Sequence, residues 1–337
     1  MSKKVAVVIL NWNGKKYLEQ FLPSVLKHNI DYSDIYLADN DSTDDSIKFV
    51  ETNYPTIKVV KNQTNSGFAQ GYNEALKNIK ADYYILLNSD VRVTDDWINP
   101  VITMMDKDLS IGACQPKIRS YNEPDFFEHA GAAGGFIDLY GFPFCRGRIF
   151  DTLEKDHGQY DDVKEIFWAT GACLFIRAEL FHKAGGFDGD FFAHMEEIDL
   201  CWRIKNMGYK IMYCPYSVVF HVGGGTLQYL NPKKTYLNFR NNLFLLFKNL
   251  PLKVLFQRLF IRMLLDGAAA IQFLIKGEFK HFNAILKAHR DFYLSINKLL
   301  KKRKGIIKSD KPGQVFTKSI VFQYFVRRKK HSSDLNL

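Results

Sequence analysis

Cysteine is scarce in this 337-residue chain, whose five cysteines are scattered and include no Cys-x-x-Cys pair. Such a pattern argues against a disulfide framework and a thiolate zinc site, and it fits a reducing cytoplasm. Long apolar runs are missing too, since no segment has the ~18 uninterrupted apolar residues that a transmembrane helix needs. The apolar segment from Val5 to Leu10 is too short and too β-branched for a signal peptide. We therefore expect a cytoplasmic chain without disulfides.

The familiar nucleotide-binding loops are also absent. The first predicted strand is followed by Asn11-Trp-Asn-Gly14 instead of Gly-x-Gly-x-x-Gly, and the chain has no Gly-Lys-Ser/Thr loop. A Rossmann dinucleotide site and a P-loop are therefore disfavoured. A sugar-nucleotide pyrophosphorylase would carry a Gly-rich loop with Arg or Lys at this point, which the sequence does not have.

Positive charge is unevenly distributed. The net charge of +10 combines an acidic body, with 23 Lys and Arg against 31 Asp and Glu in residues 1–230, and a basic tail, with 23 against 5 in residues 231–337. A nucleic-acid binder would explain the tail, but the acidic body and the lack of a recognised binding motif argue against it.

With 47% hydrophobic residues the chain can bury a large core. Apolar runs and helical periodicities alternate through the first 90 residues, which predicts an α/β fold with a mostly parallel sheet and helices on both faces. The expected strands are 5–10, 34–38, 57–60 and 83–87, and the expected helices are 15–27, 42–51 and 67–79.

The second half is mixed. We expect a helix at 97–105, strands at 112–118 and 170–176, and helices at 178–184 and 197–206, with 121–160 as a Gly- and aromatic-rich loop. Nearly everything after Pro232 is compatible with helix. The predicted organisation is a catalytic domain at 1–230 followed by a helical, basic region at 231–337.

Carboxylates stand at two predicted strand ends. Asn88-Ser89-Asp90 ends one apolar run, and Asp39 ends another. Two strand-end carboxylates in one crevice suit a nucleoside diphosphate held through a divalent cation. The alternative is that these residues only form turns, with Ser42 or Asp41 capping the next helix.

A second acidic group opens the predicted helix at 197–206. Glu196 and Glu197 are adjacent, and a helix amino terminus stabilises carboxylates, which is the structural alternative. In a partly buried cleft, repulsion between the two carboxylates would raise the proton affinity of one of them. That carboxylate could then act as a general base. Asp199 is spaced to pair with Arg203 and to brace the site.

His221 ends a predicted strand that runs into glycines. A single His in an apolar segment is usually a core residue, but adjoining glycines allow a ligand to approach the backbone closely. Joined to Asp90, its imidazole would form a mixed nitrogen and oxygen site for Mg²⁺ or Mn²⁺.

Taken in order, these motifs resemble family 2 glycosyltransferases of the GT-A fold, and most closely the bacterial rhamnosyltransferase-like branch. The resemblance covers about residues 3–250. It rests on the sequences around Asn11–Gly14, Asp39–Asp44, Asn65–Asn73, Leu86–Asp90, Thr170–Arg177, Gly185–Asp188, Met195–Arg203 and His221.

The resemblance implies an inverting transferase that moves a sugar, rhamnose in that branch, from a dTDP-, UDP- or GDP-linked donor to a growing cell-surface glycan on a lipid carrier. Asp90 and His221 would hold the metal, Glu197 or Glu196 would be the base, and the donor would contact Asn11, Asn13, Asp39, Asn65, Gly67, Asn73, Asn88 and Ser89. Trp168, with Asp199 and Arg203, would border the acceptor or support the site.

Two departures from the family pattern matter. The Asp-x-Asp element reads Asn88-Ser89-Asp90, which leaves one carboxylate for the metal, and the Glu-Asp pair reads Glu196-Glu197, which leaves the identity of the base open. The non-enzyme alternative is an inactive scaffold of the same fold in a polysaccharide assembly complex. It would be recognised by loss of the carboxylates, and all are present.

The tail carries apolar residues at helical spacing from Leu252 to Leu264, and two basic clusters, Lys298–Lys304 and Arg327–His331. A helix docked on its own protein is the alternative to one lying in a membrane interface. The clusters favour peripheral attachment to the anionic inner face of the cytoplasmic membrane. A homo-oligomer is compatible with the sequence.

Overall fold

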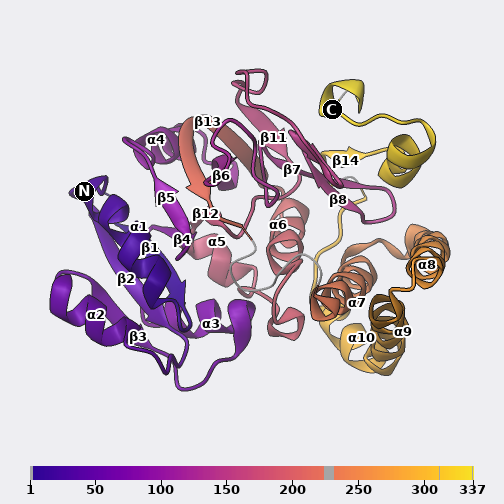
Figure 1. Cartoon of the computed structure of the whole chain (residues 1–337), viewed down its shortest axis with the longest axis horizontal. Coiled ribbons are helices and arrows are strands. Elements are labelled where there is room, and N and C mark those ends of the chain that lie inside the picture. The colour runs from indigo at the N-terminus through magenta and orange to yellow at the C-terminus, as the bar shows by residue number, and fades with distance from the viewer. Residues whose placement is uncertain (1–2, 224–230, 311, 336) are drawn as a thin grey trace.

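The computed structural model describes residues 3–223, 231–310, 312–335 and 337. A nine-stranded sheet runs through its centre (Figure 1) in the order β11-β13-β6-β12-β4-β1-β2-β3, with β5 paired to β13. The strands β1 to β4, β6 and β13 run parallel to one another, and β5, β11 and β12 run against them. The predicted, mostly parallel sheet is confirmed. The bounds are β1 Val5–Asn11, β2 Ser33–Asp39, β3 Lys58–Lys61, β4 Tyr83–Asn88, β5 Val91–Val93, β6 Ile111–Ser120, β11 Lys164–Ile166, β12 Cys173–Arg177 and β13 Lys210–His221.

Helices cover both faces of this sheet because successive strand residues point to opposite sides. Val7 of β1 packs with Leu18 and Ile102 on one face, and Val8 packs with Tyr72 and Ile198 on the other. The first face is covered by α1 and α4, the second by α3 and α6. The helices of this part are α1 Lys15–Lys27, α2 Ser46–Asn53, α3 Gly67–Leu76, α4 Asn99–Lys107, α5 Ala178–Lys183 and α6 Glu196–Asn206.

A second, five-stranded sheet lies in the segment expected to be a loop. Its order is β10-β9-β8-β7-β14, and four of its strands lie between residues 135 and 153. The prediction of a loop over 121–160 is therefore wrong. These strands are two to four residues long, too short for an alternating pattern to show. The bounds are β7 Gly135–Asp138, β8 Pro143–Cys145, β9 Arg148–Ile149, β10 Thr152–Leu153 and β14 Val315–Phe316.

The chain after Pro232 is mainly helical, as expected, but β14 interrupts the pattern by pairing with β7. Leu245 of α7 packs in the same hydrophobic cluster as Ile198 of α6, so the C-terminal region and the sheet share one core. The proposed division at residue 230 falls outside the described residues. The elements are α7 Pro232–Asn249, α8 Leu252–Ile275, α9 Phe279–Leu294, α10 Ile296–Lys304, a π-helix η2 Phe322–Val326 and a 3₁₀ turn η3 Ser332–Leu335.

Candidate active site

The carboxyl ends of three parallel strands meet at one edge of the large sheet. The register of β1 sets Asn11 beside Asp39 of β2 and Leu10 beside Asn88 of β4. The sequence therefore brings Asp39 and the Asn88–Asp90 triplet to neighbouring strand ends, as predicted from the strand pattern. This is the edge at which open α/β sheets bind ligands.

Asp39 organises the turn that follows its strand. Its Oδ1 accepts a hydrogen bond from Asn11 Nδ2 at 3.0 Å and its Oδ2 accepts one from the Ser42 amide at 2.9 Å. Its side chain is fully buried, with 1% exposure. One hydrogen bond on each oxygen leaves further acceptor capacity. A donor contact by Asp39 stays a prediction, whereas its role in shaping the loop is visible.

Asn13 fastens the loop after β1 to the loop after β2. It is exposed, has a φ of +50°, and its Oδ1 accepts from the amides of Thr43 at 2.7 Å and Asp44 at 3.2 Å. This loop occupies residues 41–45, so α2 begins at Ser46, and the expected start at Ser42 is wrong. The local hydrogen bonds of Asn and Asp side chains compete with the first helical turn.

Three predicted donor contacts position other loops. Asn65 Oδ1 accepts from Asn40 Nδ2 at 2.9 Å. Asn73 exchanges two hydrogen bonds with the backbone of Phe187, at 2.9 and 2.7 Å. Gly67 has a φ of +82°, and a Cβ there would lie 2.6 Å from the ring of Phe192. Asn73 and Gly67 therefore position the segment just before α6. Both the Oδ1 and the Nδ2 atom of Asn73 are already hydrogen-bonded to the backbone of Phe187.

Asp90, His221 and Glu128 form a buried chain of charges. His221 Nε2 lies 3.1 Å from Asp90 Oδ1, and His221 Nδ1 lies 3.1 Å from Glu128 Oε2. Asp90 follows β4, His221 ends β13, and Glu128 follows β6. Asn88 and Ser89 beside Asp90 are half-buried. The predicted pairing of Asp90 with His221 is therefore present, and Glu128 is an additional partner that the sequence did not reveal.

The two carboxylates decide the ionisation of this histidine. Burial by itself would lower the pKa of His221, but the charges of Asp90 and Glu128 raise that pKa well above its ordinary value. Burial likewise opposes ionisation of Glu128, yet His221 lowers the pKa of that carboxyl. The imidazole is thus charged when no other cation is near.

Asp90 and His221 also fit a divalent cation. Two ligand atoms, each about 2.1 Å from one ion and at right angles, lie about 3.0 Å apart, close to the separation of Asp90 Oδ1 and His221 Nε2. Within the described residues no group of three or more His, Cys, Asp or Glu side chains could hold a metal. Asp90 and His221 would thus provide two ligands, and His221 must lose its proton to become one.

Glu196 and Glu197 begin α6 as a carboxylate pair. Glu196 is buried and Glu197 is half-buried. The Oε2 atom of each accepts no hydrogen bond from the described part of the chain. Burial, followed by the charge of Glu197, raises the pKa of Glu196 well above its usual value. Burial raises the pKa of Glu197 to about 7. An unpaired carboxylate with that proton affinity suits a general base at neutral pH.

The loop that presents this pair is strained and held from the C-terminal region. Phe192, His194 and Met195 have φ values of +63°, +69° and +74°, a region that L-residues seldom adopt. Asn241 of α7 is fully buried, and its Nδ2 lies 2.8–2.9 Å from the carbonyl oxygens of Phe191, Ala193 and His194. An isolated Asn in a helix gives no sequence signal for this role.

Asp199 braces α6 against α7. It is completely buried and accepts from Arg203 Nε at 2.9 Å, from Lys248 Nζ at 2.9 and 3.0 Å and from Asn249 Nδ2 at 2.8 Å. The pairing with Arg203 is the one expected from their spacing. Arg203 also donates to the carbonyl of Gly186 at 2.8 Å, in the loop before α6.

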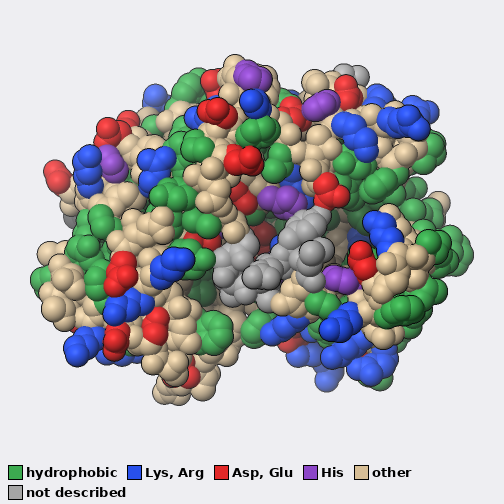
Figure 2. Space-filling view, viewed as in Figure 1, with side chains coloured by type: hydrophobic (Ala, Val, Ile, Leu, Met, Phe, Trp, Pro, Cys, Tyr) green, Lys and Arg blue, Asp and Glu red, His purple; other side chains and the backbone are tan. Residues whose placement is uncertain are grey.

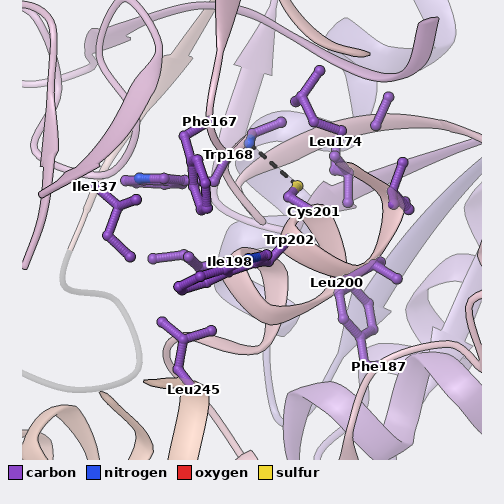
Figure 3. Close-up of a cluster of buried hydrophobic side chains, with 14 of the residues drawn as sticks. Ile137, Phe167, Trp168, Leu174, Phe187, Ile198, Leu200, Cys201, Trp202 and Leu245 are labelled. Atoms are coloured by element: carbon purple, nitrogen blue, oxygen red, sulfur yellow. Dashed lines mark hydrogen bonds between the residues drawn. The ribbon is translucent and has the colours of Figure 1, made fainter. Parts of the chain in front are cut away.

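Trp168 lies in the core. Figure 3 shows it beside Phe167 and near Trp202. Its indole N–H donates to the carbonyl of Phe136 at 2.9 Å, and its ring covers Gly135 so closely that a Cβ there would lie 2.2 Å away. Of the two roles considered for Trp168, the structure shows structural support.

The described contacts join the predicted residues in two groups. Asp90 and His221 touch directly, and Asp39 lies on the neighbouring strand end. Glu197 is carried by a separate loop, which reaches this edge through the hydrogen bond from the Phe68 amide to the Phe192 carbonyl at 2.9 Å. This hydrogen bond ties the loop before α6 to the start of α3, and the convergence of Glu197 with Asp90 and His221 on one pocket stays a prediction.

Sequence and structure comparisons identify the family and the fold. A family model described as glycosyl transferase family 2 matches residues 6–185. The N-acetylglucosaminyl-diphospho-decaprenol L-rhamnosyltransferase of Mycobacterium tuberculosis is 26% identical over 239 residues, which are 66% of this chain and 76% of that protein.

Two solved structures show the fold. GalNAc-T7, solved with UDP, GalNAc and Mn²⁺, aligns at a TM-score of 0.58 and 19% identity over 73% of this chain and 48% of that one. A mannosyltransferase from Pyrobaculum calidifontis, solved with GDP-Man and Mn²⁺, aligns at 0.54 and 14% identity over 87% and 88% of the two chains. The predicted GT-A fold is confirmed.

Proposed function

This chain belongs to glycosyl transferase family 2, in its rhamnosyltransferase-like branch, and we propose that it transfers a hexose, rhamnose as in its mycobacterial relative, from a nucleoside-diphosphate donor with inversion at the anomeric carbon. The acceptor is a hydroxyl of a growing cell-surface glycan. Its lipid linkage is inferred from the diphospho-decaprenol in the name of that relative.

The observation that carries this proposal is the unpartnered Glu197 carboxylate. A structural acid at a helix amino terminus would lie exposed or paired, whereas Glu197 is half-buried, has an oxygen without a partner in the described structure, and has a pKa of about 7. Burial and the neighbouring charge of Glu197 raise the pKa of Glu196 well above its usual value, because two adjacent buried carboxylates disfavour a second negative charge.

In the proposed reaction Glu197 takes the proton of the acceptor hydroxyl as the acceptor oxygen bonds to the anomeric carbon. The bond between that carbon and the diphosphate oxygen breaks on the opposite face, and the diphosphate leaves with the electron pair. Mg²⁺ or Mn²⁺, held by Asp90 and His221, supplies charge neutralisation for the diphosphate when bound. Glu128 holds the imidazole in place through Nδ1.

The nucleoside of the donor is proposed to be uridine, thymidine or guanosine. UDP and GDP-Man are named with the two solved structures. We propose that Asn88 and Ser89 face the diphosphate, because they precede Asp90 and are only half-buried. Asn11, Asn13 and Asp39 shape the wall for the nucleoside.

A donor screen tests this function. Thermal unfolding is followed with UDP-, dTDP- and GDP-linked sugars, each with and without Mn²⁺, because a ligand that binds the folded state raises Tm. We expect one nucleotide to raise Tm only with the metal, and to be consumed when a lipid-diphosphate acceptor is added. If no donor binds and none is consumed with any metal, the inactive-scaffold alternative replaces this proposal.

A further inference from the structure

The outer side of α8 is apolar. Phe256, Phe260 and Leu264 follow one another at four-residue spacing and are 59–72% exposed, and Ile271 and Ile275 continue the stripe. Of the 22 large hydrophobic residues exposed in the described chain, 16 lie after residue 251. Single exposed apolar residues are ordinary, but a contiguous stripe of this length indicates a surface that meets an apolar partner.

The inner side of the same helix is partly ionic. Arg262 Nε lies 2.7 Å from Asp266 Oδ1, Asp266 Oδ2 lies 3.1 Å from His289 Nε2, and Arg262 also contacts Asn242 of α7. Arg262 and Asp266 are buried. These contacts fix the rotation of α8 on the body, so its large apolar side chains point outward. The ion pairs therefore lie on the inner side of α8, and the outer side carries the exposed apolar stripe.

Positive charge borders this stripe. Residues 252–300 are all described, and none of their Asp or Glu side chains is exposed, whereas Lys276, Lys280, Lys287 and Arg290 are exposed. Figure 2 shows hydrophobic side chains at the right edge of the molecule, where Figure 1 places α8, and Lys and Arg side chains below them. An apolar stripe edged with cations complements an anionic lipid surface.

A second apolar and basic element lies at the same end of the molecule. Phe325 and Val326 of η2 are exposed, and the exposed Arg327 and Arg328 follow directly. Figure 1 places η2, in yellow, on the same side as α8. Two segments that are distant in sequence thus carry the same combination of exposed apolar and basic side chains.

The basic cluster at the end of α10 has a different role from the one expected. Lys302 pairs with both Asp188 and Asp190, Lys298 pairs with Asp190 at 2.6 Å, and Arg303 is buried and donates to the carbonyl of Phe247 at 2.6 Å. Lys298 and Lys302 therefore hold the loop before α6, and Arg303 holds the end of α7. The expectation that this cluster as a whole faces the membrane is therefore wrong.

We propose that the outer face of α8, together with η2 and its arginines, lies in the interface of an anionic phospholipid bilayer. This surface rests on the proposed function and extends it, because it would bring the crevice to a lipid-linked acceptor. No helix among the described residues is long and apolar enough to cross a membrane, so α8 is proposed to lie flat with one face in the lipid. The competing occupant of the stripe is a second copy of this chain.

Vesicle binding tests the surface without any donor, acceptor or turnover. The full chain is sedimented together with vesicles, and the bound fraction is measured at low and high salt. The vesicles contain phosphatidylcholine and phosphatidylglycerol, or phosphatidylcholine alone. We expect binding to the mixed vesicles that high salt weakens. Phe256→Glu with Phe260→Glu and Leu264→Glu should lower the bound fraction about tenfold or more.

The matched control places three glutamates at exposed apolar positions of the body, Leu109, Val163 and Tyr216. It changes the net charge equally and should bind vesicles as the parent chain does. Circular dichroism checks that both variants fold, and light scattering gives their mass.

Equal vesicle binding by the two triple variants would overturn the surface. A triple α8 variant that turns a dimer into a monomer while vesicle binding stays unchanged would assign the stripe to a second copy. Neither outcome affects the result of the donor screen. A failure of the membrane-surface proposal can therefore be distinguished from a failure of the proposed function. Arg327→Ser with Arg328→Ser should lower binding to the mixed vesicles only.

Discussion

The imidazole of His221 lies 3.1 Å from the carboxylate of Asp90, although the two residues are 131 positions apart in the sequence. A buried histidine between two carboxylates keeps its proton, because their charges raise its pKa. A divalent cation that binds Asp90 and His221 must therefore displace that proton. Asp90 and His221 can therefore share either a proton or a divalent metal ion.

Mn²⁺ binding should consequently depend on pH. Below the raised pKa of His221, displacing one proton makes the affinity rise about tenfold per pH unit, and the slope flattens above that pKa. Calorimetric titration of the donor-free protein with MnCl₂ across neutral and alkaline pH measures this slope. His221→Gln should bind Mn²⁺ more weakly and with little dependence on pH. A steep slope retained in His221→Gln would place the displaced proton elsewhere.

Glu197→Gln should lower kcat by roughly 10²–10⁴ while donor affinity changes little, because the amide cannot accept the acceptor proton. Glu196→Gln is the matched control, since it keeps the same shape and removes the neighbouring acid. We expect a smaller loss for this control. Steady-state kinetics with the donor found by thermal unfolding measure both variants, and the reverse order of effects would assign the base to Glu196.

The rate should rise with pH through about 7, the pKa of Glu197, because only the ionised carboxylate accepts a proton. The measurement is kcat/KM against pH at saturating Mn²⁺, which removes the separate contribution of His221. In Glu196→Gln the midpoint should change, because the two acids lie side by side and influence each other's proton affinity. A flat profile between pH 6 and pH 8, about one unit either side of that pKa, would contradict a base with this proton affinity.

Asn241→Ala should reduce kcat more than it raises the KM for the donor, because the loop before α6 loses the amide that holds three of its carbonyl groups. Each buried group left without a partner costs about 1–3 kcal/mol of folding free energy. Urea unfolding and kinetics are measured together. Asn283→Ala, at an exposed position of α9, is the control and should leave both unchanged. A purely structural role for Asn241 would lower Tm and leave the kinetics of the folded fraction unaltered.

Asp199→Asn should destabilise the fold by about 3–5 kcal/mol, because it leaves Lys248 and Arg203 short of a buried counter-charge. Burial would raise the pKa of Asp199, but Lys248 and Arg203 lower it. The stabilisation is thus present above the unfolded pKa of about 3.9 and is lost as the pH falls through the folded value.

Urea midpoints at neutral and acidic pH test this. The control is Asp310→Asn, whose partner Lys253 lies in an exposed pair, and it should cost no more than about 1 kcal/mol. Equal costs for the two variants would show that Asp199 contributes no more than a surface charge.

The early strands could be predicted from sequence because each is an uninterrupted apolar run that ends in a polar residue, as Tyr83–Asn88 does. The parallel order of β1 to β4 followed from the helices between them. Strands β7 to β10 escaped prediction because each is only two to four residues long, and β14 comes from residues 315–316. A pairing between residues so far apart leaves no local pattern.

The residues of the site divide in the same way. Asp90 with His221, and Asp199 with Arg203, could be anticipated from strand ends and from helical spacing. Glu128 and Asn241 could not, because each acts through partners more than 40 residues away and neither lies in a recognisable local motif. The basic residues of α10 were misjudged because their partners, Asp188 and Asp190, lie more than 100 residues earlier.

The pairing of β14 with β7 has a consequence for how the chain is made. Residue 137 pairs with residue 315, so the small sheet lacks this strand until the chain has been synthesised past residue 316. Synthesis proceeds from the amino terminus, and the nine-stranded sheet can form first. Until β14 has been synthesised, the edge of β7 has unpaired backbone groups. A strand of a neighbouring nascent chain could pair with them.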